Sequence, residues 1–423
     1  MHKPRTPGHL PVGLVALRER NFLLYAAGQF TSQLGSWIEV TAVSWIIYEM
    51  TNSPLLLGLN ALFRAVPMMV LALFGGAIAD RVPRRLLLLT TESTMLCASL
   101  VMGLLAATGQ LQYWHLYVLN FVSGSLSAFS VPARHALFGG LVPRSSLQSA
   151  VTLNAVAVRS AGFIGPSIAG LALAFAGYAL PFFLNGVSFL GMLLALVAMR
   201  LPAAQADAMA RRPGLRHGMT EGLDFVWRTP LLKIALGFEI ASGLFGHNST
   251  LITIIARDVL AAGPQGLGLL LSATGAGALL AMAMMLTFEI KQHGRVILMV
   301  GSIYAVLWAA FGVSHWLWLS VLLLFTLGTT DSVWGVTRNT IAQLSVPDAL
   351  RGRVMSVVML ATRGSSQLGR VQSGVLVDLM GAPLAVLVGA AVIGGTVLAA
   401  LRVRLPRLSA IPVEPAADRD EAL

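Results

Sequence analysis

A block of the chain is repeated at a fixed distance of 204 positions. Residues 114–177 and 318–381 share a tryptophan, arginine, glycine or proline at eight matching places, with no gap. A repeat of this length indicates that one half of the protein is a copy of the other. Because most residues between the matched positions are apolar, each half is predicted to be a bundle of membrane helices with a site between the bundles. The matched pairs are Trp114/Trp318, Gly124/Gly328, Arg134/Arg338, Pro143/Pro347, Arg159/Arg363, Gly165/Gly369, Gly170/Gly374 and Gly177/Gly381.

The composition excludes a surface that faces water. Charged residues make up 11% of the chain, against about 25% in a soluble domain, and hydrophobic residues make up 56%. We therefore predict an all-α membrane protein with twelve transmembrane helices in two pseudo-symmetric six-helix bundles, since about 20 apolar residues cross about 30 Å of hydrocarbon. The apolar runs are residues 21–49, 54–79, 86–108, 113–131, 150–176, 178–199, 231–254, 266–288, 295–313, 315–336, 354–379 and 383–401.

These runs divide the chain into five segments. We expect a cytoplasmic tail (1–20), the first bundle (21–199), a central cytoplasmic loop (200–230), the second bundle (231–401) and a second cytoplasmic tail (402–423). Within the central loop, apolar residues recur at helical spacing, which is typical of an amphipathic helix on the inner leaflet, and a plain tether is an equal alternative. These residues are Leu215, Met219, Leu223 and Val226.

The basic residues gather on one side when alternate breaks are assigned to opposite sides of the membrane. The other side has only Arg257. By the positive-inside rule both termini are cytoplasmic, and residues 51–53 and 108–110 face outside. The net charge of +11 thus reports topology, and we expect no nucleic-acid partner. Membrane lipid is an expected partner and the protein is expected to be a monomer.

Several enzyme classes lack their motifs in this sequence. No lysine follows a glycine, no histidine precedes a glutamate, and no serine stands in Gly-x-Ser-x-Gly, so a phosphate-binding loop, a zinc-protease helix and a hydrolase elbow are not expected. We expect no enzymatic activity, no cofactor and no metal site. The glycines and proline of the fifth run favour close helix packing; these are Gly162, Gly165, Pro166 and Gly170.

The break after the second run carries the most specific motif, from Gly76 to Arg85, with Asp80, Arg81, Arg84 and Arg85 as its charged members. This stretch resembles the cytoplasmic motif of the major facilitator superfamily, and the resemblance covers roughly residues 14–405. Further stretches resemble a bacterial exporter branch that includes enterobactin-exporter-like and macrolide-efflux proteins. The chain departs from the common pattern at Pro83 and Glu39. The stretches are residues 29–37, 131–134, 222–230 and 352–354.

Asp80 stands at the carboxyl end of its helix, where the helix dipole is unfavourable for an acid, so it needs a positive partner. The resemblance implies a contact with Arg134 that exists only while the cytoplasmic side is closed, which would make it a latch between two states. The alternative is a permanent loop contact, with Arg84 and Arg85 on anionic headgroups.

Charged residues inside the apolar runs are the other candidates, because each costs about 2.5 to 3.5 kcal/mol at mid-bilayer by insertion scales. Glu39 and Arg64 lie at similar depth across a short turn and are expected to pair, either as a structural clamp or as a proton-responsive or substrate-binding pair. Asp331 and Arg363 are also close in depth, whereas Arg159 has no obvious partner.

If the fold is as the resemblance implies, the first, fourth, seventh and tenth helices line a cavity. This nominates a set of polar residues, although a single buried polar residue is more often satisfied by packing than used as a ligand. The set is Gln29, Gln33, Asn120, Glu239, His247, Asn248 and Asp331.

The sequence and its resemblance to bacterial exporters therefore favour a secondary active transporter of the bacterial inner membrane that exports a small molecule, such as a drug, siderophore or related metabolite. Alternating access and exchange for protons are the expected mechanism, inferred from the missing nucleotide site and from the resemblance. An importer of a small metabolite, and a membrane receptor or scaffold on the same fold, remain alternatives.

Overall fold

The structure is a computed structural model, and it describes residues 12–79, 82–200, 215–287 and 292–402. The regular elements in these ranges are all helices. After η1 (Val12–Arg18), the first half contains α1 (Arg20–Thr51), α2 (Pro54–Ala79), α3 (Arg84–Ala107), α4 (Tyr113–Phe138), η2 (Arg144–Ser146), α5 (Leu147–Ala176) and α6 (Ala179–Ala198). The all-α fold class is confirmed.

The second half follows the same plan with one interruption. It contains α8 (Pro230–Phe245), α9 (Ser249–Ile254), η3 (Ile255–Val259), α10 (Gly263–Thr287), α11 (His293–Gly312), α12 (Leu317–Leu344), α13 (Asp348–Met380) and α14 (Ala382–Arg402). Because α8, α9 and η3 together occupy the place of one span, each half has six spans.

Nine helices in the described ranges have the length and hydropathy of a membrane span. The exceptions among the twelve spans have identifiable causes. In α1 the buried residues include the polar Gln29 and Glu39. Within α13, Arg363 and Arg370 interrupt the apolar sequence, and the seventh span is divided into segments too short to qualify. The spans that do not qualify are thus the ones that carry buried polar or charged residues or are divided.

The seventh span is broken at Gly246, His247 and Asn248, whereas the sequence predicted one continuous helix over 231–254. The freed backbone groups are satisfied locally. Trp308 donates from its indole nitrogen to the carbonyl oxygen of Phe245 at 3.0 Å, and the Asn248 side chain accepts from the amide of Leu251 at 3.1 Å and begins α9. Such partners are what allows a helix to break inside a membrane protein.

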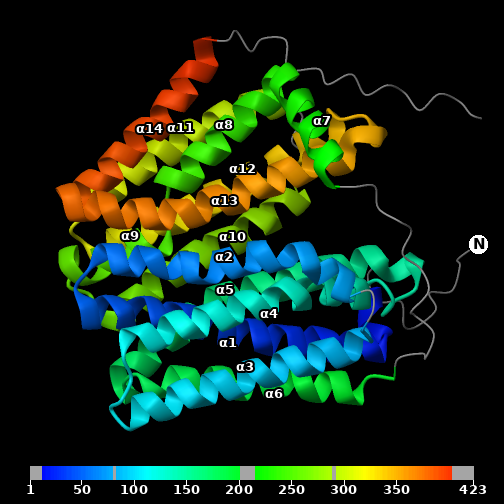
Figure 1. Cartoon of the computed structure of the whole chain (residues 1–423). Helices are drawn as coiled ribbons and strands as arrows, with labels where there is room; N and C mark the ends of the chain where they lie inside the picture. Colours follow the sequence, from blue (N-terminus) through cyan, green and yellow to red (C-terminus); the bar gives the residue numbers. More distant parts are fainter. Residues whose placement is uncertain (1–11, 80–81, 201–214, 288–291, 403–423) are drawn as a thin grey trace, which may run out of the picture.

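The central segment contains a helix, α7 (Leu215–Arg228), rather than only a tether. It is fixed to the second bundle because Glu221 forms an ion pair with Arg353 of α13. Val226 is buried, while Trp227 and Arg228 are exposed. In Figure 1, α7 lies at the end of the bundle opposite α9. We call this end the α7 end.

The halves meet along two seams, α2 against α13 and α5 against α10 (Figure 1). At one seam, a β-carbon added to Gly170 would lie 2.5 Å from the carbonyl oxygen of Pro264, and at the other a β-carbon on Gly374 would lie 2.4 Å from that of Pro54. These glycines are matched members of the repeat. The repeat therefore preserves one glycine in each seam at a point where backbones of different halves touch, an approach that glycine permits.

Candidate functional site

The end of the bundle that contains the α1–α2 turn is closed by a cluster of polar contacts between the halves, and we call it the sealed end. Arg257 of η3 forms an ion pair with Glu49 at 3.1 Å, donates to the carbonyl oxygen of Tyr48 at 3.0 Å and donates to the side chain of Asn52 at 2.5 Å. The hydroxyl of Tyr48 donates to the carboxylate of Asp258. Arg257, the lone basic residue on its side in the sequence, is thus the centre of an inter-half clamp.

On the α7 side of Arg64, a cavity of about 700 Å³ separates the first half from α13. Four methionines and other apolar side chains form part of its wall, and hydroxyls, amides and charged groups form the rest. The single carboxylate among the described lining residues is Glu92. The polar lining residues are Gln33, Ser36, Arg64, Thr91, Glu92, Ser123, Ser127, Ser130, Arg134, Ser356, Arg363 and Gln367.

Arg134 of α4 and Glu92 of α3 form an ion pair at the wall of this cavity. The Glu92 side chain is only 2% exposed and that of Arg134 is 20% exposed. Gln29 of α1 accepts a hydrogen bond from Arg134 at 3.2 Å, and Ser32 donates to Glu92 at 3.4 Å. Because the pair is buried but reaches the cavity, it is placed where a proton or a substrate could change its charge balance. Glu92 was not among the residues nominated from the sequence.

The second half holds a counterpart of this network. Arg338, which matches Arg134 in the repeat, forms an ion pair with Glu239, and Trp334 donates to the same carboxylate at 2.8 Å. Gln29 and Glu239 each lie 25 residues before a proline at the start of the next span, Pro54 and Pro264. Equivalent positions therefore contact equivalent arginines in the two halves, but only the second half places the acid there.

Glu39 and Arg64 do not form an ion pair in the described structure, which differs from the expectation. The Glu39 carboxylate instead accepts hydrogen bonds from Ser99 at 3.0 Å and from Asn185 at 2.5 Å. The cause is helix packing: α1 lies against α6, and its buried acid faces α3 and α6. Glu39 and Arg64 remain within electrostatic range.

The expected pair of Asp331 and Arg363 is also absent from the described ion pairs. Arg363 lines the cavity from α13, whereas Asp331 of α12 lies within electrostatic range of Tyr304 on α11. The two residues lie at similar depth along the membrane normal, but their side chains are on helix faces that do not meet. Arg159, the repeat partner of Arg363, is exposed and does not line this cavity.

The loop motif is only partly within the described residues. Asp80 and Arg81 lie outside them, and so does the side-chain environment of Gly76, so the proposed latch stays a prediction. Arg84 donates to the carbonyl oxygen of Ala136 at 3.2 Å, and Arg85 donates to that of Val197 at 2.8 Å. Both arginines thus bind the carboxyl ends of helices, where the helix dipole favours a cation.

Three further nominated residues make packing contacts. Asn120 donates to the Asn60 side chain at 2.7 Å, beside a cavity of about 30 Å³ that Arg64 and Arg370 also line. A ring nitrogen of His247 lies 2.7 Å from the Tyr304 hydroxyl. The Asn248 side chain joins the break in the seventh span to Ser373 of α13 at 2.8 Å. None of the three lines the larger cavity.

The glycines of α5 lie where other helices approach it. A β-carbon on Gly165 would lie 2.6 Å from Trp37 of α1. The carbonyl oxygen of Gly162 would be 2.8 Å from a β-carbon on Gly275 of α10, and that of Pro166 would be 2.5 Å from one on Gly268. The α5 residues therefore act in helix packing, as expected from their spacing, and make the α5–α10 seam narrow.

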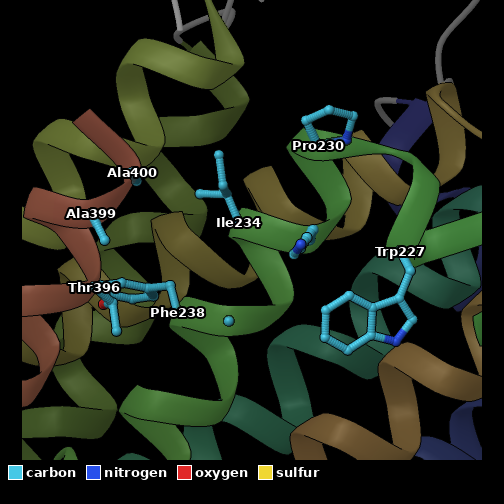
Figure 2. Close-up of a pocket in the computed structure, with 9 residues that line it drawn as sticks. Trp227, Pro230, Ile234, Phe238, Thr396, Ala399 and Ala400 are labelled. Carbon is cyan, nitrogen blue, oxygen red and sulfur yellow. The ribbon is translucent and has the colours of Figure 1, made fainter. Parts of the chain in front are cut away.

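A separate cavity of about 450 Å³ lies between α7, α8 and α14. Figure 2 shows Trp227 on one side of it and Phe238 with Thr396 on the other. Lys233 is its charged lining residue and lies over the Trp227 ring at 4.9 Å. Since it does not lie between the halves, we assign the candidate transport site to the larger cavity.

A twelve-span bundle, a duplicated plan and a cavity between the halves point to a membrane transporter. The comparison with known families shows the family to which it belongs. The model of the family described as transmembrane secretion effector matches residues 12–423. The chain belongs to this family of major facilitator transporters. It is therefore a multi-pass membrane protein of a family that transports small molecules.

Characterised relatives match most of the chain. The multidrug efflux pump Tap of Mycolicibacterium fortuitum is 28% identical, with 85% of this chain and 89% of Tap covered. The staphyloferrin A transporter of Staphylococcus aureus is 25% identical, with 84% of this chain and 89% of the relative covered. The sequence-based assignment to this superfamily and its exporter-like branch is confirmed.

The fold is shared with solved structures of low sequence identity. The crystal structure of a D-xylose–proton symporter superposes with a TM-score of 0.68 at 14% identity, covering 90% of this chain and 96% of that one. At this identity the likeness concerns the fold alone.

Proposed function

We propose that this protein is a proton-coupled exporter of a small molecule in the inner membrane of a bacterium, working by alternating access. The observation that carries the proposal is the cavity between the halves, which reaches toward the α7 end while the opposite end is clamped by Arg257. If the α7 end is cytoplasmic, this is the state that loads cargo from the cytoplasm. A relative that is an efflux pump supports this direction.

Proton coupling is supported by the ion pair at the cavity wall. Glu92 is nearly fully buried, yet its partner Arg134 reaches the cavity. Protonation of Glu92 would leave Arg134 unpaired beside the cargo site, so that binding of a proton and binding of cargo would influence each other. This exchange is the basis of antiport.

The function is tested by measuring accumulation of a panel of anionic, neutral and cationic compounds in cells with and without the protein, each with and without a protonophore. We expect lower accumulation of at least one compound in cells with the protein, and loss of that difference with the protonophore. Raised accumulation would instead identify an importer. The absence of any difference across the panel would favour a receptor or scaffold.

Glu92→Gln is expected to remove the response to the protonophore from the transport that remains, because the glutamine cannot exchange a proton. The protein should still insert, since Arg134 keeps its contact with Gln29 and with the cavity. Asp224→Asn is the matched control, because it removes one acid from an exposed helical ion pair that contributes little. Proton-dependent transport at the wild-type level in Glu92→Gln would move the coupling role to Glu39 or Glu239.

The orientation is tested by thiol labelling in a background in which Cys97, the single cysteine, is replaced by serine. Gln110→Cys lies at the sealed end and Arg144→Cys at the α7 end, and both side chains are exposed. We expect an impermeant maleimide added to intact cells to label Gln110→Cys, and to label Arg144→Cys only after the membrane is opened. The reverse pattern would invert the topology and the proposed direction of loading.

A further inference from the structure

Arginines and glutamates are not balanced around the candidate transport site. Four arginines lie at the larger cavity or directly behind it, namely Arg64, Arg134, Arg363 and Arg370, whereas the acids are Glu39 and Glu92. Two positive charges are therefore left over. Within the low dielectric of a membrane protein, an excess charge is costly unless an opposite charge accompanies it.

The excess is located on particular side chains. Glu92 is paired with Arg134. Among the described residues, Arg363 and Arg64 have neither an ion-pair partner nor a hydrogen-bond acceptor, although Glu39 lies within electrostatic range of Arg64. Behind Arg64, Arg370 lines the small adjoining cavity, and its Nε is buried without an acceptor. The guanidinium groups of Arg64 and Arg363 thus face the same cavity from α2 and α13.

The rest of the wall suits an amphipathic molecule. Met68, Met95 and Met359 supply flexible apolar surface, which adapts to the shape of a ligand. The hydroxyls of Ser123 and Ser127 add hydrogen-bonding groups without charge. A guanidinium recognises a carboxylate or a similar acid group through paired N–H donors, and such charge-assisted bonds are the strong ones.

We propose that the cargo is an organic molecule that carries two acid groups on an apolar body, bound by Arg64 and Arg363. This inference rests on the proposed function, because it names the substrate class of the same site. The two seams then have different roles. The α2–α13 seam supplies the arginines that bind the cargo, while the α5–α10 seam is closely packed through its glycines. Cargo bound between α2 and α13 would hold one arginine from each half.

The test uses two dyes with the same xanthene skeleton and opposite charge. Fluorescein is a dianion in mildly alkaline buffer, and tetramethylrhodamine methyl ester is a cation. Binding to the purified full chain in phosphatidylcholine nanodiscs is measured by fluorescence anisotropy, with empty nanodiscs subtracted. We expect fluorescein to bind at least about tenfold more tightly than the cation, and its affinity to fall as salt is raised. No detectable fluorescein binding, or equal binding of the two dyes, overturns the proposal.

Variants locate the binding. Arg363→Gln should weaken fluorescein binding by about tenfold to a hundredfold, the effect of one charge-assisted contact, and should fold because Arg363 has no partner among the described residues to lose. The control Arg200→Gln removes an exposed arginine outside the cavity lining and should leave the affinity unchanged. Unchanged affinity in Arg363→Gln contradicts the assignment of this arginine.

A final arm separates cargo from lipid, since anionic headgroups carry the same chemistry. Nanodiscs that contain phosphatidylglycerol should bind fluorescein as well as those without it. Loss of binding there would assign the arginines to lipid and overturn the proposal. These equilibrium measurements do not require transport, so that dye binding without proton-dependent transport in the cell assay would reject the proposed function while retaining the anion site.

Discussion

Glu239→Gln is expected to abolish transport and to lower the free energy of unfolding by about 3–5 kcal/mol, the cost of breaking a buried ion pair from one side. Arg338 would keep its charge with no carboxylate beside it, because Glu239 is its acidic partner in the described structure and its remaining contact is the neighbouring Asn339 side chain. The pair also joins α8 to α12, so that losing it weakens the contact between these two helices while α8 stays packed on α13 and α14.

The result is measured as thermal unfolding of the purified variant and as transport in the compound panel. Gln29→Ala is the matched control, because Gln29 contacts the equivalent arginine as a neutral amide. It should cost only about 1 kcal/mol, the usual net value of one hydrogen bond. The double variant Glu239→Gln with Arg338→Gln should recover most of the stability, since no charge is left unpaired. Wild-type stability in the single variant would show that the pair is not strong.

Gly374→Leu is expected to keep the sealed end from closing. A β-carbon at this position would already lie 2.4 Å from the carbonyl oxygen of Pro54 in the opposite half, so a leucine must separate α13 from α2. Overpacking of this kind costs about 1–3 kcal/mol, which corresponds to roughly a 5- to 150-fold shift between the two states. Because the state clamped by Arg257 is the one that suffers, transport should fall while insertion is kept.

Accessibility gives the direct measurement. In a background without Cys97, a cysteine at Ser53 next to the seam should react faster with an impermeant reagent when Gly374→Leu is present. Gly395→Leu is the control, because a β-carbon there meets no atom within 4 Å. Equal reaction rates in wild type and Gly374→Leu would mean that the α2–α13 contact does not open during transport.

The sequence predicted the fold well because its signals were long and redundant. Hydropathy, the positive-inside pattern and the repeat each described the same two bundles. The repeat went further than expected, since Gly170 and Gly374 mark the contacts between halves. Boundaries were less well predicted: the fourth apolar run was placed at residues 113–131, but α4 continues through Pro132 to Phe138, because neighbouring groups can compensate for one lost backbone bond.

The candidate site was predicted only in part because rotation about helix axes cannot be read from depth. Glu39 was expected to meet Arg64, but it faces Ser99 and Asn185. Glu92 was not nominated, because it lies on the third span, which the resemblance did not place at the cavity, whereas Glu239 lies on the seventh, which it did. The repeat would have linked Gln29 and Glu239 to the equivalent arginines Arg134 and Arg338, but it carries no signal for Glu92.

The break in the seventh span gives the second half a hinge that the first half does not have at the equivalent position. Its counterpart α1 is a continuous helix of 32 residues, and its unbroken backbone hydrogen bonds resist bending. In the second half, Gly246 and Asn248 have extended backbone, so α8 and α9 can change their mutual angle without losing a helical hydrogen bond. The segment that holds Arg257 can therefore stay with the first half while α8 moves with α12. The two halves therefore move differently: the first half keeps a rigid helix at this position, and the second half bends at the break in its equivalent helix.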